Sequence, residues 1–383
     1  MSTLKVNTVL SADTPTVNIT DGLNVTGVST VAALNTTSIV NDTPLSNRNI
    51  IINGAMTVSQ RGTSFTDNGD VSANAYTLDR FKSERDTDGA ATITQSGTSP
   101  DGFTSSLKYD ITTADTSLAA SQYAQITYKV EARDLRHLAY GTSAAKTITL
   151  SFYVRSNKTG NYNFVYEQED NGNKLSSHQY TINSADTWER KTVTFAGDTS
   201  GTWLKTNGIG LRVNFDLGTG SNFDAASLAT WLGANDLTHS SATPLVGTNA
   251  ATWQVTGVQL EIGQAATDFE HRTFAQELRL CQRYYVSYVQ QGVSGYIETS
   301  GANTAQLTHV LPVSMRANPS CTCTTATSIG VDRGGLYGIN STSGSLSWAY
   351  DNNLNVGWAM DVSRDRWHTT WCRVQNVQFN AEL

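Results

Sequence analysis

Two glutamates near the middle of the chain have the spacing closest to that of a catalytic pair. Glu167 and Glu169 come just after Tyr166 and are two positions apart, so on a strand their side chains point to the same side. Glycoside hydrolysis uses two carboxyl groups roughly 5 to 9.5 Å apart. Paired acids on a solvated strand face are also common, and the sequence gives no sign of a raised pKa. We therefore favour the solvated face over catalysis.

Signatures of other catalytic chemistry are missing from the sequence. It contains no Gly-x-Ser-x-Gly nucleophile motif and no His-Glu-x-x-His metal motif. Cys321 and Cys323 would share one face of a strand, but a zinc site needs four ligands and no second pair lies nearby. We predict that no residue is catalytic, that there is no metal centre of this kind, and that the protein is not an enzyme.

An acidic loop offers a candidate for calcium. Asp67 and Asp70 flank Asn68 and Gly69, and carboxylate oxygens are the ligands that Ca²⁺ prefers. The same four residues also suit an Asx-turn, in which the Asp or Asn side chain bonds to its own backbone. We favour the turn and keep a structural calcium as the alternative.

Aromatic residues in polar loops give the clearest binding signal. A flat ring can cover the apolar face of a sugar while neighbouring Asn, Asp and Thr side chains bond to its hydroxyls. Trp188 and Trp253 lie at or in expected strands, which favours the core. The candidates for glycan binding lie among Gly, Ser and Asn: Trp203, Trp231, Tyr337, Trp348, Tyr350 and Trp358. For each of them, filling a hydrophobic core is the alternative.

The elements that position these side chains are mainly strands. Charged residues make up 15% of the 383 residues, and Thr, Ser, Asn and Gly are abundant, which favours strands and turns. Residues 148–154, 209–217 and 124–130 alternate apolar and polar side chains with a period of two. In residues 253–262 the apolar face changes parity at Gly257, as a β-bulge requires. We expect an all-β protein with an antiparallel sandwich or jelly roll.

Charge and hydropathy exclude two classes of partner. The net charge is −7 and no block of Lys or Arg occurs, so the protein would repel the phosphates of nucleic acids and anionic membranes. No stretch of about eighteen consecutive apolar residues is present, so we expect no membrane insertion.

The chain divides into four expected parts. Residues 1–46 have short strand signals, no aromatic residue and too little apolar surface to fold alone, which predicts an oligomeric anchor or stem. Residues 47–272 form the sandwich. A helix over 273–290 begins with the capping box of Thr273 and Gln276. Residues 291–383 form a small β tip domain that holds four of the eight Trp residues.

Several stretches resemble the tail fibre proteins of marine and cyanobacterial phages. They are residues 49–62 (NIIINGAMTVSQRG), 76–81 (YTLDRF), 151–159, 253–271 and 280–285 (LCQRYY). The resemblance covers roughly residues 49–290. It implies a trimeric virion fibre that is made in the host cytoplasm, with an N-terminal anchor on the tail or baseplate, a jelly roll similar to carbohydrate-binding modules, and a distal tip that touches the host.

These observations together favour attachment to a host cell surface. We expect non-covalent binding of a surface glycan such as lipopolysaccharide, mainly through the tip domain. A tailspike-like polysaccharide depolymerase is the first alternative, although the sequence lacks the coil repeats of a parallel β-helix. A purely structural fibre or head decoration is the second.

Overall fold

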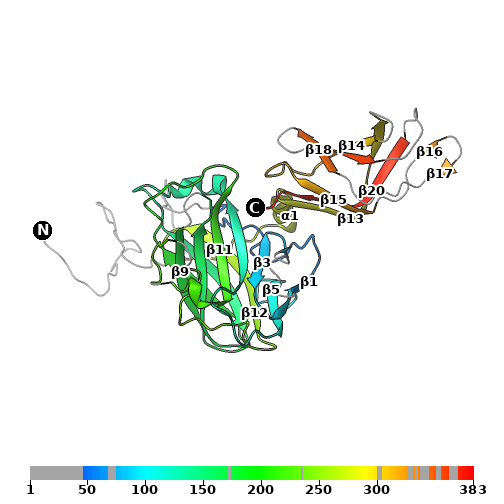
Figure 1. Ribbon diagram of the computed structural model, residues 1–383. Helices are drawn as coiled ribbons and strands as arrows, with labels where there is room; N and C mark the ends of the chain where they lie inside the picture. The colour runs from blue at the N-terminus through cyan, green and yellow to red at the C-terminus, as the bar shows by residue number, and fades with distance from the viewer. Residues whose placement is uncertain are drawn as a thin grey trace, which may run out of the picture. The chain divides into compact units, whose positions relative to one another are not determined.

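The structure is a computed structural model, and it describes residues 46–67, 75–170, 174–225, 227–233, 236–299, 304–325, 331–332, 335–336, 345–350, 355–361 and 370–383 (Figure 1). All of these residues belong to one compact unit, Asp42–Leu383. The expected anchor over residues 1–46 lies outside them, except for its last residue.

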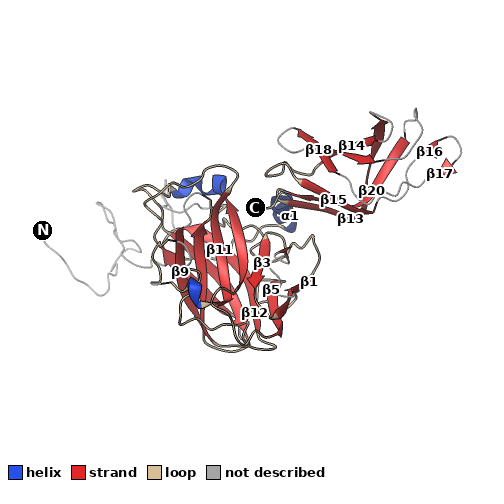
Figure 2. Cartoon of the chain, in the orientation of Figure 1, coloured by secondary structure: helices blue, strands red, loops and turns tan. Residues whose placement is uncertain are grey.

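Strands make up most of the described chain (Figure 2). The first sheet has the order β1(Ser64–Asp67), β4(Ala90–Ser96), β5(Ser106–Thr113), β12(Thr252–Ile262), β7(Ile148–Ser156), β10(Glu189–Phe195). The second has the order β2(Ala75–Tyr76), β3(Phe81–Asp86), β6(Tyr123–Glu131), β11(Ile209–Thr219), β8(Gly160–Gln168), β9(Lys174–Ile182). The strand pairs of both sheets are antiparallel.

The strand order defines a jelly roll. The eight strands from β5 to β12 form two four-stranded halves, 5-12-7-10 in one sheet and 6-11-8-9 in the other. This arrangement of two interleaved antiparallel sheets is the jelly-roll topology. Strands β1 and β4 extend one sheet, and β2 and β3 extend the other. The expected all-β fold with a jelly-roll sandwich is therefore confirmed.

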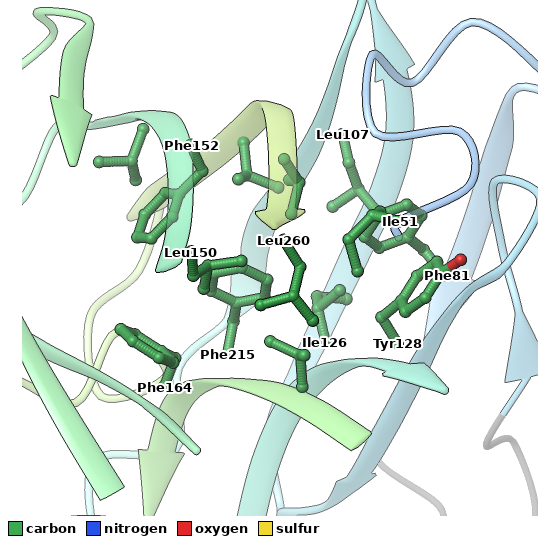
Figure 3. Packing of buried hydrophobic residues seen from close by; sticks show 14 of the residues in the cluster. Ile51, Phe81, Leu107, Ile126, Tyr128, Leu150, Phe152, Phe164, Phe215 and Leu260 are labelled. Carbon is green, nitrogen blue, oxygen red and sulfur yellow. The ribbon is translucent and has the colours of Figure 1, made fainter. Parts of the chain in front are cut away.

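The hydrophobic core lies between the two sheets (Figure 3). The rings of Phe152 in β7 and Phe215 in β11 lie 5.3 Å apart across the sandwich, and Trp253 in β12 packs 5.4 Å from Phe215. The alternating residues predicted to face inward, including Ile126, Leu150 and Val213, are buried. A period of two places every second side chain on this inner side, so the core follows from the sequence pattern.

The predicted bulge at Gly257 is present. The pairing of β12 with β7 shifts register between Thr256 and Gln259. Gly257 has φ +62°, and a Cβ there would lie 2.7 Å from the ring of Phe103. Glycine is the residue that accepts both the left-handed backbone and this close approach.

Helix α1(Phe274–Gln282) is shorter than the helix expected over 273–290. It begins with the predicted capping box of Thr273 and Gln276, and it ends before β13 starts at Tyr285. A 3₁₀ helix, η2, covers Ala132–Leu138, and a second, η3, covers Ser221–Phe223. Among the described residues, no helix is both long enough and apolar enough to cross a membrane.

Most of the remaining strands form a third sheet. Its order is β15(Ser320–Thr325), β20(Thr370–Asn380), β13(Tyr285–Thr299), β14(Thr304–Val310), β19(Asn355–Asp361), β18(Ser345–Tyr350). A separate pair consists of β16(Val331–Asp332) and β17(Gly335–Leu336). The expected boundary between 290 and 291 falls inside β13, and the division into domains stays a prediction.

The last residues of the chain contact the sandwich directly. The carboxylate of Glu382 forms ion pairs with Arg80 and with Arg61, the second at 3.2 Å. The hydroxyl of Tyr76 donates to the carbonyl of Leu383 at 2.7 Å. Arg80 is 1% exposed and lies 3.5 Å from the ring centre of Tyr284, so its charge is compensated by Glu382 and by a cation–π contact. Glu382 and Leu383 thus take part in buried polar contacts with residues of the sandwich.

Candidate functional site

The outer face of the second sheet carries a continuous set of polar side chains. In β11, Val213, Phe215 and Leu217 point into the core, so Arg212 and Asn214 point away from it. Cross-strand pairing extends the polar face on both sides of β11. Arg212 lies opposite Lys129 and Glu167, and Asn214 lies opposite Thr127. On the neighbouring β3, Glu84 lies opposite Gln125 of β6.

Arg212 is the centre of an ion-pair network on this face. Its Nη1 lies 3.3 Å from Oε2 of Glu167 and 3.3 Å from Oε2 of Glu169, and its Nη2 contacts Glu84. Lys129 Nζ lies 3.3 Å from Oε2 of Glu169. Lys82 Nζ lies 2.8 Å from Oε1 of Glu84. We call these six residues the Arg212 cluster; its three carboxylates balance its three cations.

Burial and charge separate the acidities of two carboxyl groups in the Arg212 cluster. Burial raises the pKa of Glu167, and the attraction of Arg212 only partly offsets this. For Glu84, burial is outweighed by Arg212 and Lys82, so its pKa lies below its ordinary value. Burial, together with repulsion from Arg212, lowers the pKa of Lys129. On this face Glu167 therefore takes up a proton more readily than Glu84 does.

Three buried polar atoms in and beside the Arg212 cluster have no hydrogen-bond partner among the described residues. Oε2 of Glu169 still has ion-pair contacts with Arg212 and Lys129, whereas Oδ1 of Asn214 and Nε of Arg212 have none. Asn214 is only 2% exposed, and its Nδ2 donates to Oε2 of Glu167 at 2.9 Å. An unpaired buried polar atom costs roughly 1–3 kcal/mol, so this face has unused capacity for one acceptor and one donor contact.

Of the predicted pair, Glu167 lies near the end of β8 and Glu169 lies in the turn directly after it. Both carboxylates contact the same guanidinium nitrogen of Arg212. Glu167 is largely buried rather than part of a solvated face. Sequence reasoning placed Arg212 and Asn214 on the polar side of their strand by alternation. It did not identify the Arg212 cluster, because Glu84 is far from Glu167 in sequence.

Trp203 does not provide an exposed ring for a ligand. It is 7% exposed and belongs to the core, and its Nε1 donates to Oδ2 of Asp198 at 3.1 Å. Its ring lies 4.8 Å from that of Tyr140. Trp203 lies in a loop, as expected, but its indole packs in the hydrophobic core, so the expectation of an exposed ring is wrong.

Trp231 lies at the rim of the same aromatic group. Its ring lies 5.6 Å from that of Trp203 and 6.2 Å from that of Phe195, and it is partly buried. Its Nε1 donates to the carbonyl of Ala196 at 3.3 Å. Part of this indole is open to solvent, so Trp231 remains a candidate contact residue.

The candidates of the C-terminal region keep the status of predictions. Trp348 and Tyr350 lie in β18, and Trp358 lies in β19. The two strands are antiparallel, with Trp348 opposite Gly357 and Leu346 opposite Trp358. Tyr337 lies outside the described residues.

Asp67, one half of the weak calcium candidate, has another role in the structure. It lies in β1, is buried, and pairs with Nε of Arg85 at 3.4 Å. The hydroxyl of Ser83 donates to its Oδ2 at 2.8 Å. Asp70 lies outside the described residues. Over the described part of the chain, no group of three or more His, Cys, Asp or Glu is placed to hold a metal ion.

Comparison with known proteins found no matching protein-family model and no curated protein of similar sequence. The chain is similar to a solved domain of tailspike protein 4 from bacteriophage CBA120, described as enzymatically active, with TM-score 0.31 and 13% identity over 56% of this chain. The match spans 21% of that chain.

Two solved carbohydrate-binding modules are also similar. One belongs to family 11, from a cellulase of Clostridium thermocellum (TM-score 0.27, 12% identity, 51% of this chain and 91% of that one). The other, TmCBM61, was solved with β-1,4-galactotriose (TM-score 0.27, 10% identity, 57% and 100%). The assignment of the fold rests on the strand order described above.

Proposed function

We propose that this chain is a subunit of a phage tail fibre that attaches the virion to its host by binding a surface glycan such as lipopolysaccharide. The observation that carries the proposal is the polar outer face of the second sheet around the Arg212 cluster. It offers amide, carboxylate, ammonium and guanidinium groups on a rigid sheet. Such groups bond to sugar hydroxyls, each of which is both a donor and an acceptor.

The unpaired atoms on this face favour a hydroxylated ligand. Oδ1 of Asn214 requires a donor and Nε of Arg212 requires an acceptor, and the two residues are i and i+2 neighbours on β11. One sugar hydroxyl, or two adjacent ones, can supply both. Binding then involves a small rearrangement of the Arg212 cluster, because neighbouring groups of the chain cover both atoms.

Assembly as a homotrimer completes the proposal. Residues 1–46 would dock on the tail or on a baseplate adaptor and associate with two further copies. Three linked sites convert the second and third binding events into intramolecular ones, so weak single sites suffice for attachment. In this proposal the protein acts in the virion, after synthesis in the cytoplasm of the host.

Binding of the full-length protein to a glycan array and to host cells tests the proposal. We expect specific retention on a subset of glycans, weakened at least tenfold by Asn214→Ala. Arg155→Ala is the matched control, because Arg155 pairs with Asp186 at the surface of the other sheet. Thermal unfolding of both variants separates lost contacts from lost folding. Absence of glycan binding and of cell adsorption by the wild-type protein contradicts the proposal.

Two tip variants of the full-length protein decide which region contacts the receptor. If Trp348→Ala or Trp358→Ala weakens adsorption while Asn214→Ala does not, the receptor contact lies in residues 291–383. The reverse result places it on the sandwich.

A polysaccharide depolymerase is the second candidate, and one observation favours it. The pKa of Glu167 is raised and that of Glu84 is lowered around one arginine, which is how acid and base roles are divided in glycosidases. Incubation of host polysaccharide with the protein, followed by measurement of released oligosaccharide, separates the two functions. Release that stops in Glu167→Gln would replace binding with hydrolysis as the main activity.

A further inference from the structure

A pocket of about 360 Å³ lies where β11 ends, beyond the Arg212 cluster. Its lining includes Asp216 and Gly218 of β11, Ser221 of η3, and Asp224, Thr238 and His239 of the loop that follows. Pockets for small ligands have volumes of about 300–1,000 Å³, so this one has room for one small ring compound or two at most. Arg212, Asn214 and Asp216 are spaced two residues apart on β11, so their side chains lie on the same side of the strand. The pocket therefore continues the polar face of the second sheet.

The floor of the pocket is held in place by hydrogen bonds. Oδ1 of Asp216 accepts from the backbone N–H of Gly218 at 2.9 Å and from the hydroxyl of Thr219 at 2.8 Å. Its Oδ2 accepts from the hydroxyl of Thr238 at 2.6 Å. The backbone N–H of Thr238 donates to the carbonyl of Phe223 at 3.0 Å. The chain's own hydrogen bonds therefore fasten the loop to β11 and hold the walls of the pocket in place.

Other polar groups of the lining are free to bind. Nδ1 of His239 lies 2.7 Å from the hydroxyl of Ser241 and 3.3 Å from its backbone N–H, and the neutral ring that accepts from both carries its proton on Nε2. That N–H has no partner among the described residues. The carboxylate of Asp224 and the hydroxyls of Ser221 and Ser240 likewise make no hydrogen bond within the part of the chain that the structure describes. The pocket thus presents donors and acceptors together.

The charge of the lining selects against anions. Asp216 and Asp224 both line the pocket, and none of its described lining residues is Lys or Arg. The apolar wall consists of Leu118, Ala120, Ala242 and Pro244. A ring with hydroxyls on its edge and C–H groups on its face matches this combination, and a carboxylate or phosphate on that ring would be repelled by the two aspartates.

We propose that this pocket binds one neutral or amino-substituted sugar unit of the receptor glycan and rejects acidic sugars. The inference rests on the proposed function and specifies its ligand. His239 donates to a hydroxyl, and Asp224 accepts from a hydroxyl or from an ammonium group.

Monosaccharide titrations of the full-length protein test the inference. The probes are matched sets in the gluco, galacto and manno series, each with the neutral sugar, the 2-amino sugar and the uronic acid, followed by saturation-transfer NMR. We expect the neutral or amino member of one series to bind at least tenfold more tightly than its uronic acid. Asp224→Lys should weaken binding of the amino sugar at least tenfold. His239→Ala should weaken binding of both the amino sugar and the neutral sugar. Asp101→Lys is the matched control, since Asp101 is exposed and lies outside the pocket.

The outcomes distinguish this inference from the proposed function. If the wild-type protein binds glycans on the array but Asp224→Lys and His239→Ala leave every titration unchanged, the pocket is not the site and the function stands. Equal or tighter binding of the uronic acids overturns the inference as well. If the wild-type protein retains no glycan and does not adsorb to cells, the proposed function fails.

Discussion

At the scale of single residues, burial decides what a titratable side chain does. His178 in β9 lies in the core, with its ring 5.3 Å from that of Phe164 and 4.9 Å from that of Phe195. Its Nε2 lies 3.0 Å from the hydroxyl of Ser176. Burial lowers the pKa of His178 from 6.5 to about 4. Burial has the opposite effect on the adjacent Tyr166, whose pKa it raises well above the ordinary value of 10.0.

This shift predicts a loss of stability in mild acid. Between pH 6.5 and 4 the unfolded chain binds a proton at His178 and the folded chain does not, so the stabilising contribution is present above pH 6.5 and is lost as the pH falls towards 4. The loss amounts to up to about 3 kcal/mol. The free energy of unfolding, measured with urea at several pH values, should fall less steeply with decreasing pH in two variants than in the wild-type protein. The variants are His178→Gln, which keeps a polar contact, and His178→Phe, which keeps an aromatic ring. Identical slopes in all three proteins would contradict the assignment.

At the scale of elements, the residues that follow β20 join the third sheet to the sandwich. The backbone N–H of Ala381 donates to the carbonyl of Tyr284 at 2.8 Å, and Arg316 donates to the carbonyls of Ala381 and Glu382 at 2.8 and 2.9 Å. The side chain of Glu382 is 4% exposed and binds Arg80 and Arg61. A deletion after Gln290 would remove this carboxylate and leave Arg80 buried without its partner.

Replacement of Glu382 tests the contribution of this contact. We expect Glu382→Ala to lower the free energy of unfolding by about 3–5 kcal/mol, because it leaves a buried guanidinium uncompensated. Asp101→Ala is the control, since Asp101 is exposed in a turn. Chemical denaturation measures the difference, and limited proteolysis should show faster cleavage near the C-terminus. A change in Glu382→Ala no larger than in Asp101→Ala would show that Arg80 is compensated elsewhere.

At the scale of the whole molecule, the prediction concerns assembly. Residues 1–46 contain strand signals but no aromatic residue, and such a segment buries too little surface to fold alone. We expect the intact protein to form a trimer of three 41.3 kDa chains, measured by size-exclusion chromatography with multi-angle light scattering. A chain that begins at Asn47 should be monomeric under the same conditions. A monomeric or dimeric intact protein would remove the avidity argument from the proposed function.

The sequence alone determined the features that depend on local pattern. Period-two alternation predicted the inner and outer faces of β6, β7 and β11, because successive side chains of a strand point to opposite sides. The parity change at Gly257 located the bulge, and Thr273 with Gln276 located the start of α1, since both signals lie within a few residues.

Only the tertiary structure decided which distant residues meet. Glu84, Arg212 and Glu167 come from three strands, so the Arg212 cluster exists only once the order β3-β6-β11-β8 is formed. Trp203 lies in a polar stretch that predicts a surface loop, yet contacts with Tyr140 and Asp198 bury it. Pairing between strands and the folding back of loops depend on contacts far apart along the chain, and a local residue pattern carries no information about those contacts.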